Sequence, residues 1–115
     1  MTDSCLFCSI VARDIAADIV YETDAVLAFR DIGPQAPVHI LVIPKRHIPS
    51  LAQAAVEDAE LMGEVLLAVR EVAEREGLAE AGFRTVLNTG DDGGQTVHHL
   101  HAHVLGGRGL GWPPG

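Results

Sequence analysis

The sequence predicts an α+β fold in which a mostly antiparallel five-stranded sheet packs against one long helix. Three features support this: three strand patterns in the first half of the chain, one long amphipathic pattern in the middle, and two strand patterns after it. Strands that follow one another without an intervening helix pair as antiparallel hairpins. The 115 residues show no internal repeat, so we expect residues 1–115 to form a single domain.

The first three strands are predicted at residues 19–22, 26–30 and 38–43, where β-branched and apolar residues are frequent. Thr23 and Asp24 are expected to join the first two as a hairpin. Residues 31–37 contain two prolines and one glycine, so they form a loop rather than a continuation of the sheet. Ahead of these strands, the Cys5-x-x-Cys8 segment is expected to form a short helix.

The long helix is predicted over residues 56–76, where apolar residues recur at intervals of three and four and share one face. These residues are Leu61, Met62, Val65, Leu66, Val69, Val72 and Ala73. On the opposite face, Arg70 and Glu74 are four residues apart, as are Glu71 and Arg75. Gly77 stands where a C-terminal cap is expected. We interpret this helix as a structural cover for one face of the sheet.

The last two strands are predicted at residues 83–88 and 97–105, on either side of a glycine-rich loop. Residues of a strand alternate between faces, so three histidines lie in a row on one face of the final strand. These are His99, His101 and His103, while Leu100, Ala102 and Val104 supply an apolar row on the other face. His98 falls on the side opposite the histidine row and is interpreted as a packing or surface residue.

The composition limits the classes of partner. The chain has 16 acidic and 8 basic residues, a net charge of −8, which argues against a nucleic-acid groove or an anionic membrane as the partner. The apolar stretch at residues 5–12 is short and lacks a basic lead-in, so we expect neither a signal peptide nor a membrane span. With two cysteines, the expected compartment is the reducing cytoplasm.

The histidine row is the predicted catalytic centre. Neutral imidazole is a good nucleophile near pH 7, and the phospho-imidazole that it forms can be hydrolysed. The middle residue, His101, is the economical nucleophile, because its neighbours lie about 6.6 Å away along the strand and can bind phosphoryl oxygens or the leaving group. Loop 88–96 can present backbone amides to an anion. A phosphate held by the backbone amides of Gln95 and Thr96 and by the Thr96 hydroxyl would lie within reach of the His101 ring.

Metal sites are the main alternative interpretation of these residues. Two histidines of the row could share an ion, although no acidic residue near the strand completes such a centre. A closed Cys2His2 zinc site formed by Cys5, Cys8, His47 and a histidine of the row, His99, is a stronger hypothesis. The cysteines could equally be a pair of partly buried thiols. A thioredoxin-like redox pair lacks the strand that precedes it in that fold.

Two further polar residues have competing interpretations. His39 lies in an apolar strand pattern, where a core histidine is the usual explanation. If its strand pairs near the histidine strand, it could instead orient His103. Asp31 follows the second strand in a proline-rich loop, and either caps a turn or accepts a hydrogen bond from a sugar hydroxyl.

The segment from His99 to Leu105 resembles the His-φ-His-φ-His-φ-φ motif of the histidine triad (HIT) superfamily, where φ is an apolar residue. The resemblance extends through Phe29-Arg30-Asp31-Ile32, Pro34-Gln35-Ala36-Pro37, Val42-Ile43-Pro44-Lys45, Asn88 and Gly93-Gly94-Gln95-Thr96-Val97. The ending from residue 105 to residue 115 is similar to the Hint branch. The sequence departs from that branch at Thr96, where a serine is common, at His98, where an aromatic is frequent, and in the glycines before Trp112.

The resemblance implies a homodimer whose sheets join, and hydrolysis of the P–N bond of adenosine 5′-phosphoramidates through an AMP-histidine intermediate. Purine nucleoside monophosphates are the implied ligands, and the chemistry needs no cofactor. The implied catalytic residues are His39, His99, His101 and His103. The implied nucleotide contacts are Phe7, Asp31, Ile32, Asn88, Gly94, Gln95, Thr96 and His103. The implied structural zinc ligands are Cys5, Cys8, His47 and His99.

Two other functions stay open from the sequence. One is a different reaction of the same superfamily, either dinucleotide polyphosphate hydrolysis or nucleotidyl transfer. The other is a non-catalytic protein that binds purine nucleotides.

Overall fold

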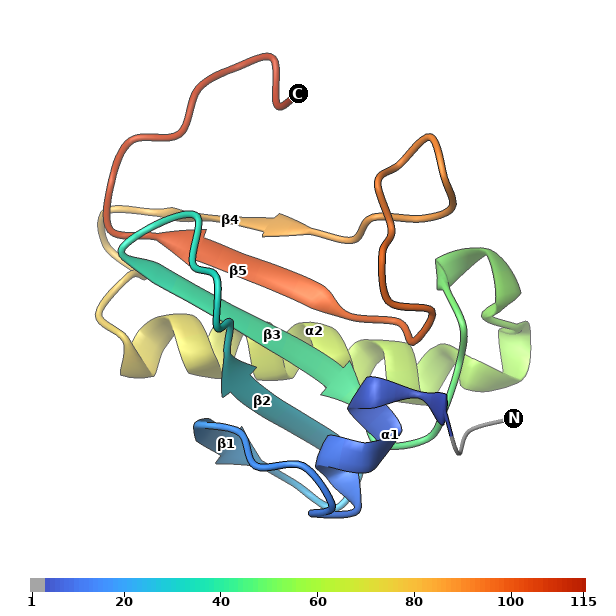
Figure 1. The fold of residues 1–115 in the computed structure, drawn as a ribbon. Helices are drawn as coiled ribbons and strands as arrows, with labels where there is room; N and C mark the ends of the chain where they lie inside the picture. The colour runs from blue at the N-terminus through green and yellow to red at the C-terminus, as the bar shows by residue number, and fades with distance from the viewer. Residues whose placement is uncertain (1–3) are drawn as a thin grey trace.

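The computed structural model describes residues 4–115 and contains the predicted five-stranded antiparallel sheet, with the strand order β1-β2-β3-β5-β4 (Figure 1). The α+β prediction is therefore confirmed. In chain order the helices and strands are α1 Leu6–Val11, β1 Ile19–Glu22, β2 Val26–Arg30, β3 Val38–Pro44, η2 Leu51–Gln53, η3 Val56–Asp58, α2 Ala59–Arg75, β4 Phe83–Val86 and β5 Ala102–Gly106. Within the described range, none of the helices combines the length and apolar character that crossing a bilayer requires.

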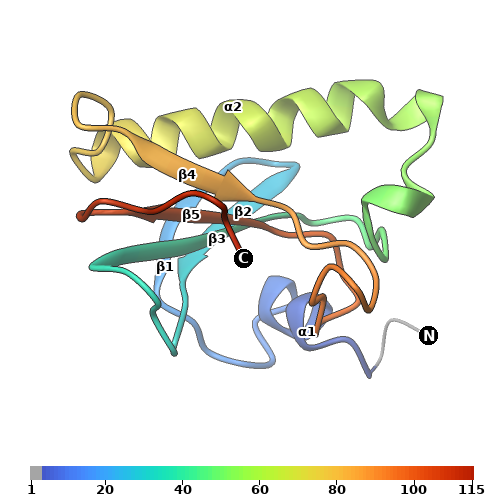
Figure 2. The same ribbon diagram turned by 90° about the horizontal axis from the view of Figure 1, so that it is seen from above.

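The sheet is covered on both faces, by α2 on one side and by α1 on the other (Figure 2). Alternate residues of the central strands therefore enter two separate cores. Val26, Ala28, Ile40 and Val42 pack under α2, and Leu27, Phe29, Leu41 and Ile43 pack near α1. All eight are buried, which explains why β2 and β3 read as nearly continuous apolar runs.

The long helix begins slightly later than predicted. Residues Val56–Asp58 form a 3₁₀ turn before the α-helix starts at Ala59. At the other end, Gly77 has a φ of +74°, the left-handed conformation expected of a C-terminal cap. Both predicted ion pairs on the outer face are present, between Arg70 and Glu74 and between Arg75 and Glu71.

The two C-terminal strands are shorter than predicted. β4 ends at Val86 rather than at residue 88, and β5 begins at Ala102 rather than at residue 97. The register of Val42 with Ala102 would place Leu100 opposite Pro44 if pairing continued. Instead the Pro44 carbonyl accepts a hydrogen bond from His99 Nε2, and the Leu100 N–H donates to Ile48. The prediction of one strand over residues 97–105 was therefore wrong, because a side-chain bond from His99 and a backbone bond from Leu100 replace the β3–β5 ladder before Ala102.

Candidate active site and metal centre

The third histidine of the row, His103, is paired with His39. The two strands that carry them, β5 and β3, are neighbours, with His103 opposite Leu41. His39 Nε2 lies 2.8 Å from His103 Nδ1, which is the contact expected if His39 orients His103. Asp31 Oδ2 lies 3.5 Å from the same nitrogen of His39.

The hydrogen bonds determine which ring nitrogen of His39 and of His103 carries the proton. The backbone N–H of Gln35 donates to His39 Nδ1 at 3.0 Å, so a neutral His39 ring carries its proton on Nε2. That proton is donated to His103 Nδ1, which leaves the proton of the neutral His103 ring on its own Nε2. His103 thus offers an N–H donor from its Nε2 atom, which suits contact with a phosphoryl oxygen.

The middle histidine, His101, has the opposite polarity. Its Nδ1 donates to the backbone carbonyl of His99 at 2.7 Å, and because a carbonyl only accepts, Nε2 of the neutral ring holds a lone pair. Burial lowers the pKa of His101 below its ordinary value, against smaller opposing effects of that hydrogen bond and of Asp31. The ring is therefore neutral at pH 7, in the state that a nucleophile requires.

His101 and His103 line a cavity of about 270 Å³, together with the polar residues Arg30, Asp31 and Thr96. The cavity is otherwise mainly apolar, and its wall includes Leu6, Phe7, Ile10, Ile15, Phe29 and Ile32. The Phe7 ring meets the His101 ring edge to face, with centroids 5.1 Å apart. A flat apolar group such as a purine base suits the apolar part, and a phosphate suits the histidine end.

Some of the predicted nucleotide contacts line this cavity and others do not. Phe7, Asp31, Ile32, Thr96 and His103 do, although the Ile32 side chain is otherwise fully exposed. Asn88, Gly94 and Gln95 belong to the loop beside the cavity, outside its lining. Sequence reasoning missed Leu6 and Ile10, whose spacing of four on a short helix was the signal available.

Gln95 is used within the protein. Its side-chain oxygen accepts from the Gly90 N–H at 3.0 Å, and its backbone N–H donates to the Gly90 carbonyl at 3.1 Å. Its side-chain nitrogen donates to the carbonyls of Pro49, at 2.7 Å, and Val97, at 3.0 Å. The residue is buried, so these bonds hold the glycine-rich loop against the segment that follows β3.

Gly93 stands at a position of the loop that has no room for a side chain. A methyl group there would lie 2.8 Å from the backbone nitrogen of Thr89 and closer still to its carbonyl oxygen. We expect Gly93→Ala to lower the free energy of unfolding by about 1–3 kcal/mol, because rigid backbone must move. Urea unfolding checks this, with Gly109→Ala, which points into open space, as the matched control. Equal stability of the two variants would contradict this loop geometry.

The environment of His103 makes stability depend on pH. Burial, followed by the nearby His101 and His39, lowers its pKa from 6.5 to about 4. Between these values the unfolded chain binds a proton that the folded chain does not, so this contribution to stability is lost as the pH falls from about 6.5 to about 4. Urea unfolding at pH 7 and pH 5 should show this loss, and His103→Gln should reduce it. An unchanged pH dependence in the variant would count against a half-buried, neutral His103.

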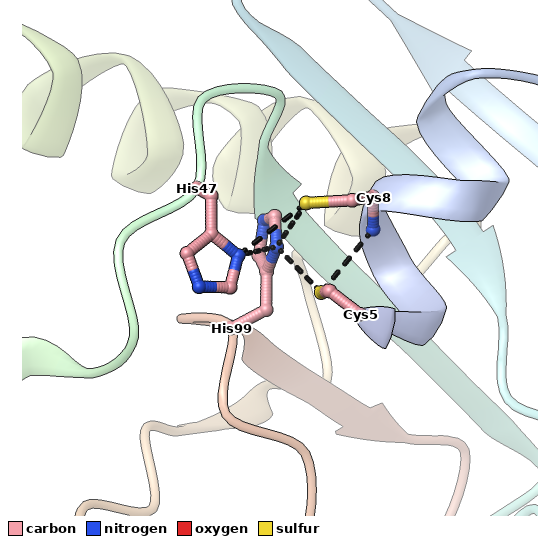
Figure 3. A group of neighbouring side chains, drawn as sticks. All are labelled: Cys5, Cys8, His47 and His99. Carbon is pink, nitrogen blue, oxygen red and sulfur yellow. Dashed lines mark hydrogen bonds between the residues drawn. The ribbon is translucent and has the colours of Figure 1, made fainter. Parts of the chain in front are cut away.

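The predicted zinc ligands come together at the N-terminal end of α1 (Figure 3). Cys5 Sγ lies 3.3 Å from His99 Nδ1, and Cys8 Sγ lies 3.3 Å from His47 Nδ1. The two Nδ1 atoms are 3.1 Å apart, and all four ligand atoms lie within 4.8 Å of one another. Both cysteines are thiols rather than a disulfide.

The donor set fits a tetrahedral zinc ion. His99 Nε2 donates to the Pro44 carbonyl at 2.8 Å, so Nδ1 of the neutral ring presents a lone pair to the centre of the cluster. A carbonyl partner on the second ring nitrogen is the usual arrangement for a metal-bound histidine. In the absence of metal, burial and then Cys5 raise the pKa of Cys8 to about 11, and a divalent cation would favour the thiolate instead.

Asp31, His39 and His103 also have ligand atoms within 4.8 Å of one another. Their hydrogen bonds account for this proximity, since the proton on His39 Nε2 joins the two rings. A metal ion is therefore not needed to explain why these three side chains lie together.

Three alternating histidines that lead into β5 lie beside an apolar cavity, in a fold that combines an antiparallel sheet with one long helix. These features define the class of protein. The chain belongs to the HIT domain family, whose sequence model matches residues 12–110. Among its relatives, the purine nucleoside phosphoramidase of Escherichia coli K12 is 47% identical over 111 residues, which are 96% of this chain and 93% of the relative. An uncharacterised HIT-like protein of Synechococcus elongatus is 59% identical over the full length of both chains.

Solved structures agree with this assignment. A HIT family hydrolase from Legionella pneumophila superimposes with a TM-score of 0.96 at 48% identity, over 97% of this chain and 100% of that one. A HIT family hydrolase from Clostridium thermocellum gives a TM-score of 0.93 at 42% identity, over 96% of each chain. The predictions of a HIT fold and of an enzyme of the hydrolase class are confirmed.

Proposed function

We propose that the enzyme hydrolyses the P–N bond of adenosine 5′-phosphoramidates through an AMP group carried on Nε2 of His101. The observation that carries this proposal is the fixed polarity of the two histidines at the end of the cavity. His101 holds its proton on Nδ1 against the His99 carbonyl, which leaves Nε2 as the nucleophile. His103 holds its proton on Nε2, and the two ring centroids are 5.0 Å apart.

The reaction has two steps. The Nε2 lone pair of His101 attacks phosphorus, the P–N bond breaks, and the amine leaves as it takes up a proton from solvent. Water then attacks the phosphorus of the adenylated ring and gives up a proton to solvent. The P–N bond to histidine breaks, and AMP is released with the neutral imidazole restored. The His103 N–H donates to a phosphoryl oxygen in both steps and stabilises the charge that develops there. We expect this chemistry to need no cofactor, because the histidines and the backbone amide groups of the loop supply the nucleophile and the hydrogen-bond donors.

The rest of the nucleotide is assigned to the neighbouring surfaces. Phe7 and Ile32 bound the base, and the Asp31 carboxylate accepts hydrogen bonds from the ribose hydroxyls. Asn88, Gly94 and Thr96 supply phosphate contacts, and Gln95 supports them by holding the loop. The relative named purine nucleoside phosphoramidase supports this choice of substrate class.

We also propose that Cys5, Cys8, His47 and His99 hold a structural zinc ion. The four donors converge, and the His99 ring has the orientation of a metal ligand. Zinc–thiolate bonds suit a reducing compartment, so we expect the enzyme to act in the cytoplasm.

A homodimer is the expected assembly. β4 forms one end of the sheet, so its outer edge can pair with another strand, and Phe83 is exposed on it. On the outer face of α2, Leu66 is 54% exposed and Leu67 is 63% exposed. A second copy that pairs with β4 edge to edge would extend the sheet. Analytical ultracentrifugation should give twice the chain mass, and a monomer at micromolar concentration would contradict this expectation.

The substrate assignment is tested by comparing kcat/KM for an aminoalkyl adenosine phosphoramidate and for a diadenosine polyphosphate. We expect the phosphoramidate to be strongly preferred and to yield AMP and the free amine. Preference for the dinucleotide would assign the protein to another HIT reaction. Binding of AMP without turnover of either compound would identify it as a nucleotide-binding protein.

A further inference from the structure

One residue joins the cysteine-histidine cluster to the nucleophile. The His99 ring belongs to the cluster, while its backbone carbonyl accepts the Nδ1 proton of His101 at 2.7 Å. We propose that metal bound by Cys5, Cys8, His47 and His99 positions His101 for attack, so that the cluster controls the nucleophile as well as anchoring α1. This proposal rests on the proposed function, in which His101 is the nucleophile.

The backbone around His99 lacks the support that a strand would give it. β5 begins at Ala102, so strand pairing does not hold the His99 carbonyl in place. One backbone hydrogen bond, of 2.7 Å from the Leu100 N–H to the Ile48 carbonyl, holds the peptide group that contains the His99 carbonyl. His47 and His99, which adjoin these two residues in the chain, both point into the cluster (Figure 3). A metal ion would therefore fasten the same two segments a second time, at the residue whose carbonyl holds His101.

A second route runs through α1. Phe7 lies between the two cysteines in the sequence, and its ring meets the His99 and His101 rings edge to face, with centroid distances of 5.9 and 5.1 Å. Cysteines held by a metal fix α1, and α1 fixes this ring against the nucleophile. Loss of the metal loosens the carbonyl on one side of His101 and the aromatic wall on the other.

The test compares the wild type with a Cys5→Ser, Cys8→Ser double variant. His98→Gln is the matched control, because His98 is an exposed histidine next to His99 but outside the cluster. Each protein is analysed for zinc, and circular dichroism establishes that it is folded. Long-range ¹H–¹⁵N NMR spectra show which ring nitrogen of His101 is protonated, with assignment by comparison with His101→Asn. Rapid-quench kinetics give the rate of the first adenylation.

We expect stoichiometric zinc and a single Nδ1–H form of His101 in the wild type and in the control. The double variant should lack zinc, show mixed ring forms of His101, and adenylate about 10- to 100-fold more slowly, the range seen when a group that orients a ligand is removed. If the double variant does not fold, chelation of zinc from the wild type and its replacement should change and restore the His101 ring signals.

Two results would overturn the proposal: a wild-type protein that binds no metal, or a metal-free protein with unchanged His101 ring signals and adenylation rate. Failure of the proposed function gives a different pattern. In that case the wild type does not become adenylated, while the ring signals of His101 still respond to zinc.

Discussion

His101→Asn is expected to abolish phosphoramidate hydrolysis, with a fall in kcat of at least about 10⁴-fold, the scale for loss of a nucleophile. The Asn side chain can donate its amide to the His99 carbonyl in place of His101 Nδ1, so the local fold should persist. It offers no lone pair equivalent to that of Nε2. The affinity for AMP should change little, because the base, ribose and phosphate contacts that we propose are made by other residues.

The measurements are steady-state turnover of an aminoalkyl adenosine phosphoramidate and calorimetric titration with AMP. His98→Asn is the matched control, since it changes an exposed histidine in the same segment and should keep full activity. Substantial turnover by the His101 variant would remove His101 from the nucleophile role. Loss of both AMP binding and turnover would support only a binding role for His101.

Zinc is expected to produce the largest change in thermal stability. A ligand that binds only the folded state stabilises it by about 4 kcal/mol at 1,000 times its Kd. For a domain of this size, that corresponds to an increase in Tm on the order of 15 °C. Differential scanning calorimetry of the chelator-treated protein, before and after addition of zinc, measures this shift.

The Cys5→Ser, Cys8→Ser double variant is the control for specific binding, because it removes both thiolate ligands and should lose nearly all of the zinc-dependent shift. Equal shifts in the double variant and in the wild type would show that zinc acts elsewhere on the protein. No shift in the wild type would show that the four side chains are a cluster of hydrogen-bonded thiols and imidazoles.

The sequence was informative where local chemistry decides the structure. The proline-rich loop and the helical spacing of apolar residues predicted the element types correctly, and Gly77 is the predicted cap. The bounds of the first two strands were also correct. The alternation of His99, His101 and His103 with apolar residues also predicted the candidate site. It did not reveal that residues 97–101 leave the sheet, because this depends on the carbonyls of Pro44 and Ile48, which come from another part of the chain.

The positions of the protons on the histidine rings could not be predicted for the same reason. Which nitrogen of His103 carries a proton is set by the backbone N–H of Gln35 through His39, and a backbone group leaves no mark in the residue pattern. Gln95 is a further example, because its amide could contact either phosphate or protein. The structure shows it bonded to the backbone of Gly90, Pro49 and Val97. The sequence therefore predicted the candidate site residues more readily than the backbone groups that they contact.

In the proposed reaction, AMP is carried on Nε2 of His101. The most direct test is mass spectrometry of the enzyme, quenched during its first turnover of an adenosine phosphoramidate and digested at neutral pH, since the phospho-imidazole bond is labile. We predict one adenylyl group on the peptide that contains His101, localised to that residue by fragmentation. An adduct on a different residue, or rapid turnover without any covalent adduct, would contradict the account.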